Sequence, residues 1–159
     1  MFRIGYGNDL HRLTPGQPLM LGGVRIESEM GAEGHSDADA LAHAVTDAIL
    51  GALALGDIGA HFPNSDDRWA NAESLVFLRY AVGLMKQHGY SMANLDSTIE
   101  LEQPKLGPYI DQIKNALATV LESDPGSISV KAKTGEGVGA VGEGRAIRAT
   151  AVVLIRRDE

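Results

Sequence analysis

The sequence contains no cysteine, which excludes disulfide bonds, thiolate metal ligands and a cysteine nucleophile. A transition metal bound by this chain must therefore be held by imidazole nitrogens and carboxylate oxygens. Positive charge is also scarce: 14 Lys and Arg stand against 21 Asp and Glu, and the formal net charge is −7. This balance argues against a general nucleic-acid binder, which usually carries a basic face.

Long hydrophobic runs are missing as well. The longest apolar stretch, residues 48–56, is too short to cross a bilayer, and residues 1–9 lack the basic-then-apolar pattern of a signal peptide. We therefore expect a cytoplasmic protein without a membrane partner. Aromatic residues make up only 5% of the chain, so base stacking on aromatic side chains is not expected. A length of 159 residues suits one domain, which we assign to residues 1–159.

The periodicity of apolar residues predicts the α/β (α+β) class: a mixed β-sheet with helices packed on one face. A helix is expected to begin with Ser36 as its N-cap and to end near Gly56. A second helix should end at Gly89, and a third should open at Pro108. The predicted strands are residues 2–7, 19–26, 95–101, 128–133 and 146–156, and the predicted helices are 36–56, about 71–88 and one from 108 onward.

Three residues form a candidate metal site. Asp9 and His11 point to the same side of a strand or its extension, because side chains alternate along a strand. His43 would complete a set of two imidazoles and one carboxylate, which leaves a tetrahedral zinc ion one open position. Asp39 and Asp47 lie four residues before and after His43, and either acid is a candidate partner for its far nitrogen. Spacing alone favours the simpler alternative of a polar strand end and a capped core histidine.

Two further segments are candidate phosphate sites. His35 and Ser36 lie at the predicted helix start, where free N–H groups and the helix dipole favour an anion. Lys133 opens a glycine-rich loop that lacks the Walker pattern, yet its Glu136 suits a hard cation such as magnesium beside a diphosphate. Lys105 is a candidate cation for a phosphorylated substrate.

Four groups of residues follow one another along the chain: Arg3–His11, His35–Asp39 with His43, Asp57–Gly59 with Phe62–Pro63, and Pro104–Lys105 followed by Lys131–Thr134. Taken in order, these segments resemble one family, the 2-C-methyl-D-erythritol 2,4-cyclodiphosphate synthases of the non-mevalonate isoprenoid pathway. The resemblance extends from residue 3 to about residue 155. It implies conversion of 4-diphosphocytidyl-2-C-methyl-D-erythritol 2-phosphate to the 2,4-cyclodiphosphate with release of CMP, by intramolecular phosphoryl transfer.

The resemblance also implies the roles of individual residues. Zinc would be bound by Asp9, His11 and His43, and magnesium or manganese by Glu136. His35 and Thr134 would be catalytic. The family forms a homotrimer whose active sites lie between subunits, with zinc on one subunit and the cytidine pocket on its neighbour. The implied substrate-binding residues are Asp9, His11, His35, Ser36, Asp57, Ile58, Gly59, Phe62, Pro63, Asn64, Ser65, Asp66, Leu101, Lys105, Leu106, Ala132, Lys133, Thr134, Gly135 and Glu136.

Two other functions are kept as alternatives. A zinc phosphohydrolase would use the open metal position to activate water and would release a ring-opened phosphate instead of a cyclic diphosphate and CMP. A non-catalytic binding protein would keep the trimer and lose the chemistry. The binding protein predicts damaged ligands, whereas Asp9, His11 and His43 are all present.

Overall fold

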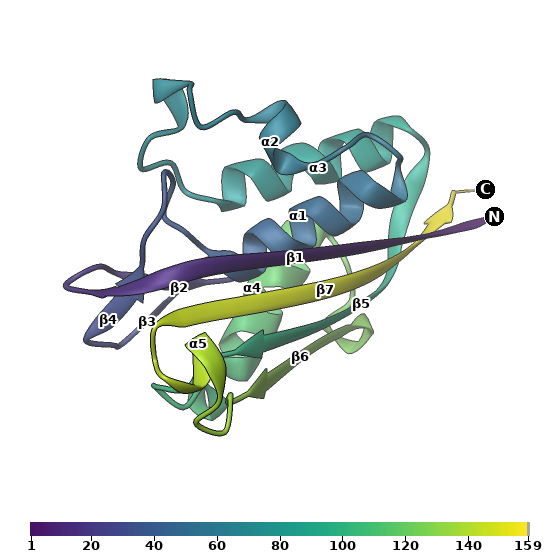
Figure 1. Ribbon diagram of the computed structural model, residues 1–159. Coiled ribbons are helices and arrows are strands. Elements are labelled where there is room, and N and C mark those ends of the chain that lie inside the picture. Colours follow the sequence, from purple (N-terminus) through teal and green to yellow (C-terminus); the bar gives the residue numbers. More distant parts are fainter. Residues whose placement is uncertain (159) are drawn as a thin grey trace.

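The computed structural model describes residues 1–158, in which five strands form one mixed sheet (Figure 1). The strand order is β4-β1-β7-β5-β6, with β5 and β6 parallel and the other neighbours antiparallel. A separate hairpin is formed by β2 and β3. The strands are β1 (Phe2–Pro15), β2 (Leu19–Leu21), β3 (Val24–Ile26), β4 (Met30–Ala32), β5 (Tyr90–Glu100), β6 (Ile128–Lys133) and β7 (Ala146–Arg157).

The three long helices cover one face of this sheet, as predicted (Figure 1). Helix α1 lies against β1 and β7, α3 packs on α1, and α4 packs beside β6. The long helices are α1 (Ala40–Ala52), α3 (Leu75–Gln87) and α4 (Ile110–Leu121); the short ones are α2 (Ile58–His61), α5 (Gly139–Gly142) and the 3₁₀ turns η1 (Asp67–Trp69), η2 (Gly107–Tyr109) and η3 (Pro125–Ser127). No helix among the described residues combines the length and apolar character that crossing a membrane requires.

Helix α1 sits unusually close to β1 because two glycines face it. A Cβ at Gly5 would lie 1.8 Å from the carbonyl oxygen of Ala48, and one at Gly7 would lie 2.0 Å from that of Ala44. No larger side chain fits at either position without moving the helix. This close packing holds the first turns of α1 beside the middle of β1, where Asp9 and His11 lie.

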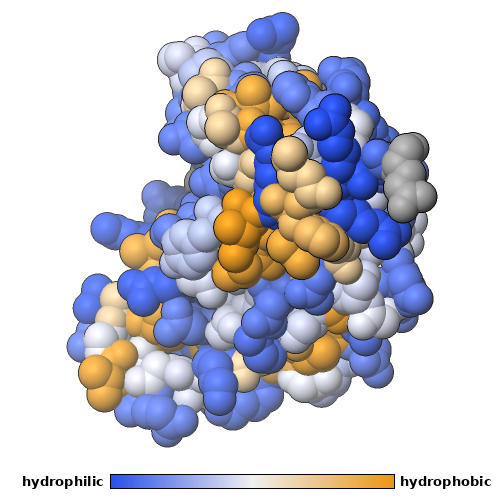
Figure 2. Space-filling view, turned by 90° about the vertical axis from the view of Figure 1, so that its right-hand side faces the viewer, coloured by the Kyte–Doolittle hydropathy of each residue, from blue (hydrophilic) through white to orange (hydrophobic). Residues whose placement is uncertain are grey.

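The side of β1 that faces away from the helices is exposed and hydrophobic. Phe2, Ile4 and Tyr6 are more than 60% exposed, and Leu10 is 54% exposed. Figure 2 views the molecule from the side where both termini lie and shows hydrophobic side chains gathered there. Contiguous exposed apolar surface of this kind marks an interaction face.

Several predicted elements differ from the observed ones. Residues 19–26 form a hairpin rather than one strand, because Gly22 and Gly23 both adopt positive φ and turn the chain. The short strand β4 was not predicted. Helix α1 begins at Ala40 with Asp39 as N-cap, so the assignment of Ser36 as N-cap is wrong. Helix α3 begins only at Leu75, although its end before Gly89 is as predicted.

The end of α1 offers a test of backbone strain. Ala54 is exposed, has φ +60° and follows the C-cap residue Leu53, a position at which glycine is usual. An L-residue pays a steric cost in this left-handed conformation. We expect Ala54→Gly to raise the free energy of unfolding by about 0.5–1 kcal/mol, measured by thermal or urea denaturation. Ala116→Gly, in the middle of α4, should destabilise instead; a lower melting temperature for Ala54→Gly would contradict the strain.

Candidate metal centre and substrate cavities

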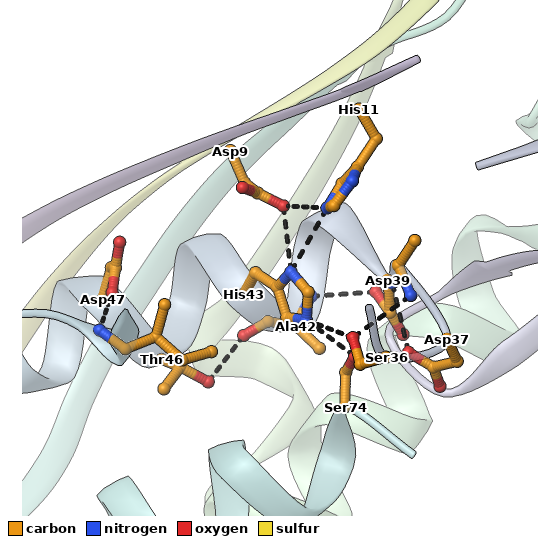
Figure 3. A network of polar contacts seen from close by, with 12 residues as sticks. Asp9, His11, Ser36, Asp37, Asp39, Ala42, His43, Thr46, Asp47 and Ser74 are labelled. Carbon is orange, nitrogen blue, oxygen red and sulfur yellow. Dashed lines mark hydrogen bonds and ion pairs between the residues drawn. The ribbon is translucent and has the colours of Figure 1, made fainter. Parts of the chain in front are cut away.

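Asp9, His11 and His43 converge in the structure, as predicted (Figure 3). Asp9 and His11 project from the same side of β1, and His43 projects from the first turns of α1. Asp9 Oδ2 lies 2.7 Å from His11 Nε2 and 3.0 Å from His43 Nδ1, and the two nitrogens are 3.3 Å apart. Residues more than 30 positions apart in the chain therefore direct one oxygen and two nitrogens at a common point.

The charge state of this cluster suits a cation. Burial disfavours the charged form of Asp9, but the contacts with the imidazoles of His11 and His43 outweigh it and lower the pKa of Asp9 to about 2. Burial likewise disfavours a charged His11, while its contact with Asp9 outweighs burial and raises the pKa of His11. Asp9 is consequently ionised at neutral pH.

The donor set fits a zinc ion. Zinc binds imidazole nitrogen and carboxylate oxygen at about 2.0–2.2 Å, which separates neighbouring ligand atoms by roughly 3.3–3.6 Å in a tetrahedron. The His11 and His43 nitrogens already have this separation. Asp9 Oδ2 lies closer to the two nitrogens, at 2.7 and 3.0 Å. Three protein ligands leave the fourth position open, as in catalytic zinc sites.

The predicted partners of the far nitrogen of His43 are wrong. His43 Nε2 lies 2.7 Å from the hydroxyl of Ser74, not beside Asp39 or Asp47. Asp39 accepts hydrogen bonds from the N–H groups of Gly22, Gly23 and Ala42, and Asp47 accepts one from Ile58. Both acids are therefore used to fix the backbone.

A cavity of about 520 Å³ opens beside the three ligands. Its lining includes nine of the residues predicted to bind substrate, together with Trp69 and Phe77. Phe62 packs against both aromatic rings, with centroids 4.9 and 4.6 Å away, so one wall of the cavity is apolar. The lining residues are Asp9, His11, Gly34, His35, Ser36, His43, Ile58, Gly59, Phe62, Pro63, Asn64, Trp69 and Phe77.

The loop that contributes Phe62, Pro63 and Asn64 to this cavity is held by local hydrogen bonds. His35 Nε2 lies 3.3 Å from the Asp66 carbonyl, and the His35 carbonyl accepts from the N–H of Asn71. Asp66 also pairs with Arg68 at 2.6 Å, and this contact lowers the pKa of Asp66. Asp57 caps α2 through the N–H of Ala60. Ser36 is four residues ahead of the helix, so the helix-terminus argument for an anion at Ser36 does not hold.

A second cavity, of about 320 Å³, is lined by six of the other predicted substrate-binding residues. The predicted residues that line neither cavity are Asp57, Ser65, Asp66, Gly135 and Glu136. The second cavity shares no lining residue with the first cavity in residues 1–158. Thr134, which lines this cavity, donates to Glu136 at 3.0 Å, and Glu102 accepts from the N–H of Gly135 at 2.8 Å. The lining residues are Leu101, Pro104, Lys105, Leu106, Gly107, Ile110, Ala132, Lys133 and Thr134.

The residues missed from the sequence include Ser74, Trp69 and Phe77. Ser74 was hidden because the helix was predicted to start near Asn71, which placed Ser74 inside its first turn. Trp69 is the only tryptophan of the chain and lies in a polar loop, a signal that an apolar wall is built there. Phe77 carries no sequence signal that separates it from an ordinary core residue.

The fold and this cluster define an α+β protein with a candidate metal site beside a cavity. The YgbB family model matches residues 2–156, and the chain belongs to that family. It is 56% identical over 155 residues to the 2-C-methyl-D-erythritol 2,4-cyclodiphosphate synthase of Solibacter usitatus, covering 98% of both chains. The family predicted from the motifs is thus confirmed.

Solved structures agree with this membership. A 2C-methyl-D-erythritol-2,4-cyclodiphosphate synthase superposes with a TM-score of 0.91 at 43% identity, covering 97% of this chain and all of that one. IspF of Plasmodium falciparum, solved as a CDP complex, gives a TM-score of 0.89 at 37% identity, covering 99% of this chain and 97% of that one. The predicted fold class is confirmed as well.

Proposed function

We propose that this chain converts 4-diphosphocytidyl-2-C-methyl-D-erythritol 2-phosphate to 2-C-methyl-D-erythritol 2,4-cyclodiphosphate and CMP in the non-mevalonate pathway. The convergence of Asp9, His11 and His43 beside a substrate-sized cavity, in a chain so similar to such synthases, carries the proposal. A 2-phosphate oxygen forms a bond to the β-phosphorus, and the bond from that phosphorus to the CMP oxygen breaks. CMP leaves with the bonding electrons.

The metal ions proposed are zinc at Asp9, His11 and His43, and magnesium or manganese at Glu136. A zinc ion held by the three ligands would supply Lewis-acid stabilisation of the charge that develops on the phosphates. Glu136 is exposed on the loop after β6, so its carboxylate can face a diphosphate. Carboxylate oxygen is the ligand that magnesium prefers.

The first cavity is proposed to hold the methylerythritol phosphate end of the substrate. His35 and Ser36 present an imidazole and a hydroxyl to it, and the apolar wall excludes water from the phosphates. Because the nucleophile is already an ionised phosphate, positioning and charge neutralisation supply most of the rate. The proposed substrate contacts in this part are Asp9, His11, His35, Ser36, Asp57, Ile58, Gly59, Phe62, Pro63, Asn64, Ser65 and Asp66.

The second cavity is proposed to hold the cytidine. The CDP complex of the Plasmodium relative supports a cytidine ligand. Lys105 and Lys133 bring positive charge to an acidic chain, and Thr134 is the proposed catalytic hydroxyl. The proposed contacts here are Leu101, Lys105, Leu106, Ala132, Lys133, Thr134, Gly135 and Glu136.

We propose a homotrimer in which the two cavities of neighbouring subunits form each active site. Within one chain the cavities are separate, so a single substrate needs a second subunit to bridge them. The exposed apolar side of β1, with Phe2, Ile4 and Tyr6, offers a surface for that contact. The single domain 1–159 and the cytoplasmic location stay predictions of the sequence.

The proposal is tested by purifying the protein, measuring zinc per chain and following CMP release from the substrate in magnesium buffer. We expect about one zinc per chain and a cyclic diphosphate formed in equal amount to CMP. Release of a ring-opened phosphate would support the phosphohydrolase instead. A protein that binds no zinc and releases no CMP would contradict the proposed synthase activity.

A further inference from the structure

Ser74 occupies the N-cap position of α3 without capping the helix. Its side chain makes no capping hydrogen bond, although serine is among the best N-cap residues. The residue is fully buried, and its hydroxyl instead lies 2.7 Å from His43 Nε2 and donates to Asp37 Oδ1 (Figure 3). The Ser74 hydroxyl therefore contacts His43 and Asp37 instead of the free N–H groups at the start of α3.

The direction of these hydrogen bonds determines the protonation of His43. A serine hydroxyl has one hydrogen, and Ser74 donates it to the carboxylate of Asp37. Only its lone pairs remain for His43, so the bond to Ser74 requires a hydrogen on Nε2. In a neutral imidazole this leaves Nδ1 with a free lone pair, and Nδ1 is the nitrogen that faces Asp9 and His11.

Asp37 is itself fixed by the backbone. Its Oδ1 accepts the N–H of Asp39 at 3.2 Å, and its own N–H donates to the carbonyl of Ala72 at 3.0 Å. The segment before α1 and the segment before α3 are therefore tied together behind His43. Ser36 Oγ lies 3.1 Å from His43 Nε2 and 3.2 Å from Ser74 Oγ, which adds a second, longer contact to the same nitrogen.

We propose that Ser74, held by Asp37, is a positioning residue that keeps His43 in its Nε2–H tautomer and presents the free Nδ1 to the metal. This inference rests on the proposed zinc site, and it assigns to Ser74 the role expected of Asp39 or Asp47. Groups that hold the second nitrogen of a metal-bound histidine set its tautomer and ring orientation, and their loss weakens metal binding by roughly 10–100-fold.

The first test compares Ser74→Ala with the wild type in the zinc-free protein. The ¹⁵N shifts of the His43 ring, read at a pH where it is neutral, should show the Nε2–H tautomer in the wild type. In Ser74→Ala we expect a shift toward Nδ1–H, because Asp9 then becomes the stronger acceptor. Zinc affinity, measured by competition with a chelator, should fall by roughly 10–100-fold, and Ser74→Thr, which keeps the hydroxyl, should restore both.

The matched control is Ser97→Ala. Ser97 is also buried, and its hydroxyl donates to the Ser129 carbonyl within the sheet, far from the cluster in the sequence. Losing a buried hydroxyl there should change stability without changing the His43 tautomer or zinc affinity. An equal loss of zinc affinity in Ser97→Ala would make the Ser74 effect a general loss of stability and overturn the inference.

A second pair of variants, at Asp37, tests the inference if Ser74→Ala does not fold. Asp37→Asn keeps an amide oxygen to accept from Ser74 and should retain the tautomer, whereas Asp37→Ala should lose it. The inference is overturned if zinc-free wild type shows Nδ1–H, or if Ser74→Ala keeps both tautomer and affinity. A wild type that binds no zinc at all would instead overturn the proposed function, and the tautomer would still decide the role of Ser74.

Discussion

Replacing His43 with alanine is expected to remove the bound zinc and to lower CMP release by at least about 10³-fold. The change deletes one of three ligand atoms, which leaves Asp9 and His11 as an incomplete set on β1. Several kcal/mol of transition-state stabilisation are lost with the metal, and each 1.36 kcal/mol is a factor of ten in rate. Zinc per chain is measured by atomic absorption, and CMP release by chromatography.

His88→Ala is the control for this prediction. His88 is the exposed C-cap residue of α3 and lines neither cavity, so its loss should leave zinc content and rate unchanged. Circular dichroism of both variants shows whether the fold is kept. Full zinc content and full activity in a folded His43→Ala protein would show that the cluster is not the metal site.

The placement of two of the candidate metal ligands could be predicted from the sequence because it depends on simple periodicity. Asp9 and His11 are two residues apart, and β1 continues through both, so they share a face. The approach of His43 needed the resemblance to a known family. The structure gives its physical basis in Gly5 and Gly7, which let α1 pack directly on β1.

The start of α1 could not be predicted from local signals, because two competing caps are present. Ser36 and Asp39 are both good N-cap residues, and the sequence pattern does not rank them. The chain resolves this through Ala38, which adopts φ +55° and interrupts any helix before Asp39. Long-range contacts decide the rest, since Asp39 also binds the hairpin turn at Gly22 and Gly23.

The predicted partners of His43 Nε2 are wrong for the same reason, because local sequence signals do not show long-range contacts. Helical spacing placed Asp39 and Asp47 on its face, but spacing does not show which groups the backbone has already engaged. Ser74 reaches His43 from α3, more than 30 residues away in the sequence. A contact of this kind depends on how two helices pack, and no local pattern encodes it.

Asp39→Ala is expected to cost about 3–5 kcal/mol of stability. The carboxylate is fully buried and accepts the N–H groups of Gly22, Gly23 and Ala42 at 2.7–2.9 Å. Each buried N–H left without a partner costs about 1–3 kcal/mol, and the loss of the N-cap adds to this. Urea denaturation measures the change. Asp124→Ala, which removes an exposed carboxylate that caps the short turn η3, should cost far less.

The stability difference between wild type and Asp39→Ala depends on pH through the pKa of Asp39. Burial raises that pKa above its usual value of 3.8, while the three N–H groups oppose the rise. Folding then favours the protonated acid, so the contribution of Asp39 is fully present below pH 3.8 and declines as pH rises through the raised pKa. The stability gap between wild type and Asp39→Ala should therefore narrow from about pH 4 upward, yet stay positive at pH 7 because the three N–H groups still need an acceptor. A gap that widens with pH would mean that these hydrogen bonds outweigh burial and that the pKa of Asp39 is lowered instead.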